Sequence, residues 1–172
     1  MKKKIFLFTI CILTTAISCN QAKPSNSMKK FNTELLKPKS AQISRLKLED
    51  SESSKKEFKM DIVLNSFMLE NQKTETSIAL DFIPLNIQNV DELENKTLEF
   101  PINPESGYID GSIYLFNVHN PFDVKKIEFG KITNSTIETS IYYDIVFEYE
   151  KTGYENIINK KMTFPLSIEK LK

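Results

Sequence analysis

The feature that most constrains the fold of this chain is a strict alternation of residue types near its C-terminus. From residue 137 to residue 149 the odd positions are apolar or threonine, and the even positions are mainly polar. After a turn that contains Gly153, apolar residues recur at even positions: Ile158, Met162, Phe164, Leu166 and Ile168. A period of two places successive side chains on opposite faces of a strand. The pattern therefore predicts a long antiparallel hairpin that turns near residues 151–155.

Shorter alternating segments precede this hairpin. Strands are expected over residues 43–48, 58–64, 78–82, 98–102 and 127–132, the last with a bulge at Gly130. Residues 112–118 are apolar on both faces, which is typical of a central strand covered on both sides. Met28, Phe31 and Leu35 have helical spacing, which predicts a short N-terminal helix that ends at Pro38.

About eight strands with little helix predict an all-β domain. Frequent turns between short strands favour an antiparallel β-sandwich. The alternative is a strongly curved sheet or half-barrel, lipocalin-like in outline, because long strands twist strongly.

The N-terminus has the composition of an export signal. Lys2, Lys3 and Lys4 precede an apolar segment that ends at Ser18. This segment is shorter than the about 20 apolar residues that span a bilayer, so a cleaved signal is expected. We expect residues 1–18 to be the signal peptide, residues 19–27 to be the modified cysteine and a flexible tether, and residues 28–172 to form a single β-rich domain.

Ala16-Ile17-Ser18-Cys19 resembles the lipobox of bacterial lipoproteins, although Ala16 departs from the usual leucine. The resemblance covers this segment alone. It implies that the Cys19 thiol carries diacylglycerol, as palmitate-type chains, that hold the protein on a membrane. Asn20 stands where an aspartate often retains lipoproteins at the inner membrane. The implied location is the bacterial cell envelope, on the outer membrane and facing the periplasm. An ordinary secretory signal, also cut after Ser18, is the alternative.

The composition excludes several kinds of chemistry. Cys11 would leave with the signal and Cys19 would be lipidated, so the domain would hold no disulfide, zinc–thiolate cluster or cysteine nucleophile. Removing the three signal lysines from 23 basic residues leaves 20 against 23 acidic residues. A nucleic-acid-binding domain would carry a clustered basic excess, so no nucleic-acid partner is expected. No cofactor and no metal site is expected either.

Three residues are candidates for binding. His119 is the only histidine, and we expect it in a loop after the segment 112–118, where Asp123 could orient its imidazole. The alternative is that His119 is merely a loop residue before a proline turn. Tyr142 and Val146 fall on the polar side of their strand and could form an exposed patch for a partner, because aromatic residues are enriched at interfaces. The alternative is that a second sheet covers this face.

Three carboxylates share that polar side: Asp144, Glu148 and Glu150. Alternate residues of a strand lie about 7 Å apart, a distance that suits a pair of hydrolytic carboxylates. These side chains would point in parallel from one surface, however, and Lys160 and Lys161 could neutralise them across the hairpin. A solvated face is therefore expected.

The leading hypothesis is a membrane-anchored, non-enzymatic β-domain that binds a protein or a ligand of the envelope. An immunity or inhibitor lipoprotein that neutralises an exported toxin is the second hypothesis. A hydrolase that uses Glu148, Glu150 or His119 is the third. A carrier of a small ligand is the fourth, and it would require an apolar cavity inside the domain.

Overall fold

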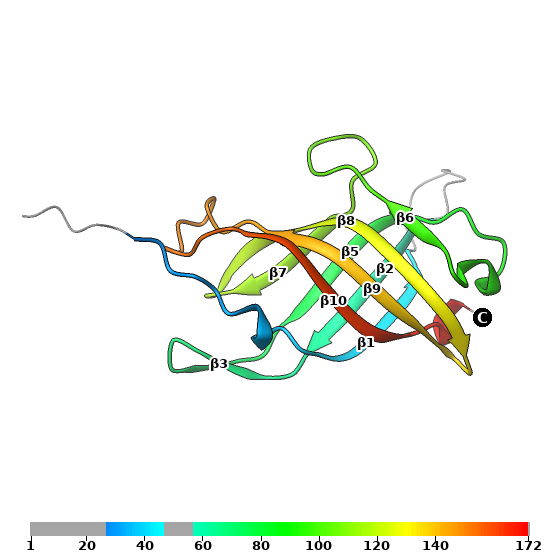
Figure 1. Ribbon diagram of the computed structural model, residues 1–172, viewed down its shortest axis with the longest axis horizontal. Helices are drawn as coiled ribbons and strands as arrows, with labels where there is room; N and C mark the ends of the chain where they lie inside the picture. The colour runs from blue at the N-terminus through cyan, green and yellow to red at the C-terminus, as the bar shows by residue number, and fades with distance from the viewer. Residues whose placement is uncertain (1–26, 47–56, 172) are drawn as a thin grey trace, which may run out of the picture.

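The computed structural model describes residues 27–46 and 57–171, and these residues form a β-sheet that closes on itself (Figure 1). Seven strands make the closed barrel in the order β8, β7, β5, β2, β1, β10 and β9, and β9 pairs with β8 again. Strand β6 adds to the edge of β8, and β3 pairs with β4 as a separate hairpin.

The strands in chain order are β1 (Pro38–Arg45), β2 (Glu57–Leu64), β3 (Phe67–Leu69), β4 (Gln72–Thr74), β5 (Ser77–Pro84), β6 (Thr97–Glu99), β7 (Asp110–Leu115), β8 (Val118–Thr133), β9 (Thr136–Ile145) and β10 (Ile157–Ser167). Three short 3₁₀ turns accompany them: η1 (Thr33–Leu35), η2 (Val90–Leu93) and η3 (Glu169–Leu171). None of the helical segments within the described ranges is long and apolar enough to cross a membrane.

The barrel closes through an unusual pair of strands. All other neighbours in the ring are antiparallel, whereas β1 and β10 run parallel, with Gln42 opposite Ser167. The first and the last strand of the chain are therefore neighbours in space (Figure 1). Closure pairs strand edges that would otherwise be open to other chains.

Large apolar side chains fill the inside of the barrel. Phe58, Phe122, Tyr143 and Phe147 are among its largest buried residues, and the rings of Phe122 and Tyr143 stack with centroids 4.4 Å apart. A barrel of about eight strands has an interior just wide enough for such side chains.

The all-β class is confirmed, but a β-sandwich does not describe the sheet. One sheet curls into a ring, so the alternative of a strongly curved sheet was nearer to the observed fold. Register shifts in the 16-residue strand β8 contribute to this curvature, one between Val124 and Lys126 and another between Phe129 and Ile132. A bulge bends its strand and increases the local twist, which favours closure over two flat layers. The second shift confirms the bulge expected at Gly130.

The N-terminal helix predicted from Met28, Phe31 and Leu35 is wrong. Only the single turn η1 is helical, and the Asn32 side chain caps it by accepting a hydrogen bond of 3.1 Å from the Glu34 N–H. The residues before Asn32 are extended, because the Lys29 N–H donates to the Gly153 carbonyl at 2.8 Å. Pairing with a distant loop therefore overrides the local helical spacing.

The two-faced segment 112–118 is a hairpin and not one central strand. Strand β7 ends at Leu115 and β8 begins at Val118, with a two-residue turn at Phe116 and Asn117. Tyr114 points outward and is 59% exposed, so apolar residues on both faces did not mean that both faces were covered.

Two bulges move side chains to the face opposite to the predicted one. Phe82 was expected inside but is 41% exposed with φ of +58°, and Ile83 is buried instead. Ile158 was also expected inside but is 52% exposed, because the register between Ile157 and Lys160 shifts at Asn159. An added residue shifts the two-residue period, so the buried positions are odd on one side of a bulge and even on the other, as with Ile157 and Met162 in β10.

The alternation of the C-terminal hairpin is confirmed along the paired part of its strands. Strands β9 and β10 are antiparallel, with Ile141 opposite Met162, and the odd positions of β9 are buried. Strand β9 ends at Ile145, however, and residues 146–156 form the connection to β10. Tyr149, predicted to continue the strand, is 70% exposed in that connection.

Candidate functional site

Four segments meet at one end of the barrel, which we call the hairpin end. They are the β3–β4 hairpin, the β7–β8 turn, the β9–β10 connection (146–156) and residues 27–31, on the left of Figure 1. Lys29 joins three of them, because its backbone bonds to Gly153 and Glu155 and its side chain binds Glu70. The start of the described chain is therefore fastened to this end.

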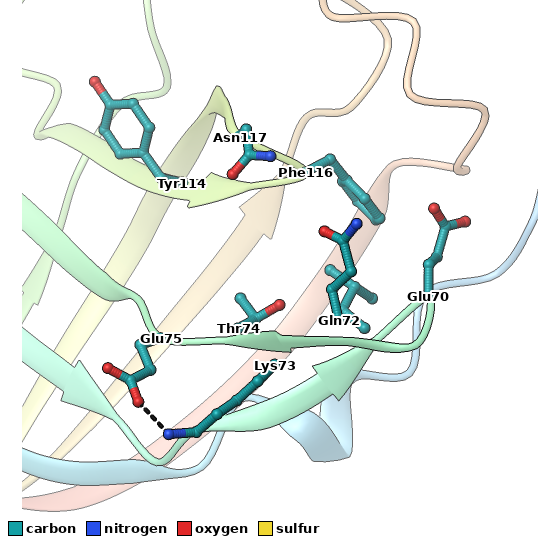
Figure 2. A pocket seen from close by; sticks show the side chains of 9 residues that line it. Glu70, Gln72, Lys73, Thr74, Glu75, Tyr114, Phe116 and Asn117 are labelled. Atoms are coloured by element: carbon teal, nitrogen blue, oxygen red, sulfur yellow. Dashed lines mark hydrogen bonds and ion pairs between the residues drawn. The ribbon is translucent and has the colours of Figure 1, made fainter.

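A groove of about 560 Å³ lies between the β3–β4 hairpin and the β7–β8 turn (Figure 2). Its lining is mainly polar and comprises Leu69, Glu70, Gln72, Lys73, Thr74, Glu75, Tyr114, Phe116 and Asn117. Amide, hydroxyl and carboxylate groups thus stand beside the exposed ring of Tyr114. A few polar groups that converge in a concave site can orient a ligand.

Both hairpins that frame the groove use two-residue turns with left-handed backbone. Glu70 and Asn71 have φ of +47° and +68°, and Phe116 and Asn117 have φ of +56° and +61°. Such turns match the twist of the flanking strands, but they favour Gly, Asn or Asp. A bulky residue such as phenylalanine is an outlier in this region, so packing must hold Phe116 there.

An aromatic cluster of Phe31, Phe116, Phe147 and Tyr154 holds this turn. The rings of Phe116 and Tyr154 stack with centroids 4.7 Å apart and planes 27° apart. Phe147 meets Phe116 edge-on at 6.2 Å and also contacts Phe31 at 5.7 Å. Three of the converging segments therefore meet in one stack of rings.

Glu70 is held by an ion pair and a hydrogen bond. Its Oε1 accepts from the Lys29 Nζ at 2.6 Å and from the Tyr154 hydroxyl at 3.1 Å. The Lys29 hydrogen bond, followed by that of Tyr154, lowers the pKa of Glu70, while partial burial and then Glu70 raise the pKa of Tyr154. Both partners of the ion pair are well exposed, so solvent screens it and its main effect is to fix positions.

Asn120 supports the β7–β8 turn from inside the barrel. Its side-chain amide is fully buried and donates to the carbonyls of Ile113, Leu115 and Val118 at 3.4, 3.3 and 3.0 Å. Its Oδ1 is buried without a hydrogen-bond partner. A buried polar group of this kind makes the turn dependent on one side chain.

The structure places His119 in strand β8 and not in a loop. Its side chain is exposed, and its ring lies edge-on to that of Tyr114 with centroids 5.5 Å apart. Asp123 stands four residues further along the strand, about 13 Å away, too far to orient the imidazole. Burial, followed by the charge of Asp144, raises the pKa of Asp123. The structure therefore packs His119 against Tyr114, a residue that lines the groove, and separates Asp123 from its imidazole.

Tyr142 lies on the outer face of the barrel, away from the groove. Lys126 and Lys161 lie 4.0 and 4.9 Å from its ring centre, and its hydroxyl donates to Glu128 at 2.9 Å. The hydrogen bond from Lys126, followed by that from Tyr142, lowers the pKa of Glu128. Charged side chains cover the ring, so this face is neither an exposed apolar patch nor one covered by a second sheet.

The three carboxylates predicted for one face are separated. Asp144 forms an ion pair of 2.8 Å with Lys125 and accepts from the Asn159 N–H at 2.7 Å, which supports the bulge of β10. Glu148 and Glu150 lie in the connection that follows β9. Lys161 binds Glu128 and not those glutamates, at 3.5 Å. Asp144 therefore has a structural environment, and the strand that would have aligned it with Glu148 and Glu150 ends at Ile145.

The predictions from sequence did not include the groove or the turns that frame it. Both turns consist of a residue followed by asparagine, Glu70-Asn71 and Phe116-Asn117, between alternating segments. Asparagine tolerates the left-handed region, so this repeated pair was the signal that could have predicted two hairpins.

The lipid site predicted at Cys19 lies outside the described residues. Within residues 27–46 and 57–171, no three His, Cys, Asp or Glu side chains are grouped so as to hold a metal ion. Comparisons with models of protein families, with curated proteins and with solved structures found no match.

Proposed function

We propose that this protein is a lipid-anchored component of the bacterial envelope whose barrel is a non-catalytic binding module. The groove at the hairpin end receives the partner, which is a protein or a ligand of the envelope. The observation that carries this proposal is the groove itself, a polar hollow beside the exposed ring of Tyr114 and framed by two left-handed turns.

The backbone of Phe116 supports the choice of this site. Strained residues persist only where the surroundings hold them, and they cluster at functional sites. Here the aromatic cluster holds the turn, so the groove is preformed and a partner would bind without ordering it first.

The engagement of the two glutamates that line the groove favours binding over catalysis at this site. Glu70 is bound by Lys29 and Tyr154, and Glu75 is bound by Lys73. The hydrogen bonds from these lysines lower the pKa of both carboxyls, whereas a general acid at neutral pH needs a raised pKa. On the barrel wall, Asp144 forms an ion pair with Lys125.

Site-specific photo-crosslinking in living cells tests the groove. A benzophenone amino acid replaces Tyr114 in the full-length protein, and the matched control replaces Phe82, an exposed ring in a different strand, β5. We expect discrete adducts from position 114 and none of the same mass from position 82. The same adducts from both positions, or none from position 114, would refute the groove as the binding site.

Metabolic labelling with an alkyne fatty acid tests the anchor separately. Wild-type protein should incorporate the label, and the Cys19→Ala variant should not. Equal labelling of the two would show that Cys19 is not the lipid site.

A further inference from the structure

Exposed apolar side chains concentrate at the hairpin end. The four most exposed large apolar residues of the described ranges all lie there: Met28 (59%), Met68 (59%), Tyr114 (59%) and Tyr149 (70%). Tyr114 borders the groove, whereas the other three come from three separate segments. Phe67 and Leu69 on either side of Met68 pack on the core, so Met68 points outward from β3.

Backbone and side-chain bonds bring these three segments together. Met28 precedes Lys29, which binds both Glu70 of the β3–β4 turn and Gly153 of the connection that carries Tyr149. The exposed apolar residues are therefore grouped at one end of the barrel. Singly scattered apolar residues are normal on a protein surface, whereas a group of them indicates an interaction site.

The length of chain before Ser27 limits how far this end can stand from the proposed anchor. Eight residue steps separate Cys19 from Ser27, and a chain extends by at most about 3.6 Å per residue. Whatever its conformation, this segment spans at most about 29 Å. The anchor would thus keep the hairpin end near the lipid and raise its effective concentration there, so a weak apolar contact suffices.

The charge of the hairpin end indicates what kind of surface it fits. Lysines at positions 29, 30, 73 and 151 are balanced by glutamates at positions 70, 75, 148, 150 and 155. Attraction to anionic lipid needs a cluster of basic residues, which this end lacks. Tyrosine favours the boundary between headgroups and acyl chains, and methionine adapts to irregular apolar surroundings.

We propose that the hairpin end rests on the membrane surface and that Met28, Met68 and Tyr149 insert into its interfacial layer. This inference rests on the proposed attachment of lipid at Cys19. It adds an orientation: the groove faces the membrane, and the far end of the barrel faces away from it.

Fluorescence of single tryptophans tests this orientation, because the chain has no natural tryptophan. The chain from Cys19 to Lys172 contains every described residue and a single cysteine. Coupling Cys19 to a maleimide phospholipid in phosphatidylcholine vesicles attaches the barrel chemically. Tyr149→Trp reports on the hairpin end, and Phe82→Trp is the matched control in a strand outside it.

The Tyr149→Trp variant should shift its emission to the blue and lose intensity in vesicles of brominated lipid, and the Phe82→Trp variant should do neither. Adding Met28→Ser and Met68→Ser should reverse the shift, and replacing part of the lipid with phosphatidylglycerol should leave it unchanged. Equal quenching of both variants, or none of Tyr149→Trp, overturns the proposal. Quenching that ceases when envelope extract is added shows that another component covers this end, which also overturns it.

Chemical coupling keeps this test independent of the proposed function. If the fluorescence test fails, the labelling of Cys19 and the adducts of position 114 remain valid results. Both are measured in cells, on protein whose Cys19 has not been coupled chemically.

Discussion

Two substitutions of Phe116 can separate the cost of its left-handed backbone from the stabilisation that its ring contacts provide. Phe116→Ala removes the ring but keeps a β-carbon at φ of +56°, whereas Phe116→Gly removes both. The two variants lose the same contacts with Tyr154 and Phe147, so the difference between them reports mainly on the backbone.

The expected magnitudes follow from the environment of Phe116. A fully buried phenylalanine contributes about 1.5–3 kcal/mol, and Phe116 is half-buried, so about 1 kcal/mol is lost with its burial. Its aromatic contacts add about 0.5–1.5 kcal/mol. Phe116→Ala should therefore lower the free energy of unfolding by about 2 kcal/mol. Phe116→Gly should lower it by about 1 kcal/mol less, because glycine adopts the left-handed region without strain.

Urea unfolding followed by circular dichroism measures both variants. A Phe116→Ala variant as stable as wild type would show that the ring stack does not hold the turn. Equal stabilities of the alanine and glycine variants would show that the backbone of Phe116 is not strained. Either result would contradict the argument that packing maintains a preformed groove.

Three further predictions concern the barrel wall and interior, each measured by denaturant unfolding. Gly111→Ala should destabilise by about 3 kcal/mol or more, because the new β-carbon would lie 2.0 Å from the Phe122 carbonyl oxygen, whereas Gly130→Ala, with 3.3 Å to its nearest atom, should be mild. Asn120→Ala should destabilise by about 1–3 kcal/mol, since it removes the buried amide that donates to three carbonyls under the β7–β8 turn; a loss below about 0.5 kcal/mol would mean that the turn does not depend on this amide. Burial, followed by the charge of Glu34, raises the pKa of Tyr143 to about 12, so the folded state keeps this proton longer than the unfolded chain does and stability falls between about pH 10 and 12. Tyr143→Phe should remove about 2–3 kcal/mol of that fall, and an unchanged pH dependence would contradict the assignment.

The alternation of β9 and β10 was predictable because one face packs on a core and the other meets solvent. This difference produces a period of two in the sequence. The burial predicted from that period is confirmed for Ile137, Ile141 and Phe164. It failed at Phe82 and Ile158, where a bulge inserts one residue. Neither bulge contains glycine or proline, so no local signal marked the change of face.

The site was less predictable than the strands, because distant segments create it. Lys29, Glu70 and Tyr154 are far apart in the chain, and only the closed sheet brings them together. The residues singled out from sequence were chosen by type and by their place on a strand. Of these, His119 contacts Tyr114, which lines the groove, whereas Tyr142 and Asp123 lie elsewhere on the barrel wall.

Because β1 pairs with β10, the barrel cannot close until β10 is present. Synthesis proceeds from the N-terminus, so one edge of β1 has no partner until the segment around Ser167 has been synthesised. A product truncated before β10 would keep two open strand edges, at β1 and β9, that invite pairing with other chains. Only a chain that includes β10 closes the ring, so strand pairing separates chains that contain β10 from those that lack it.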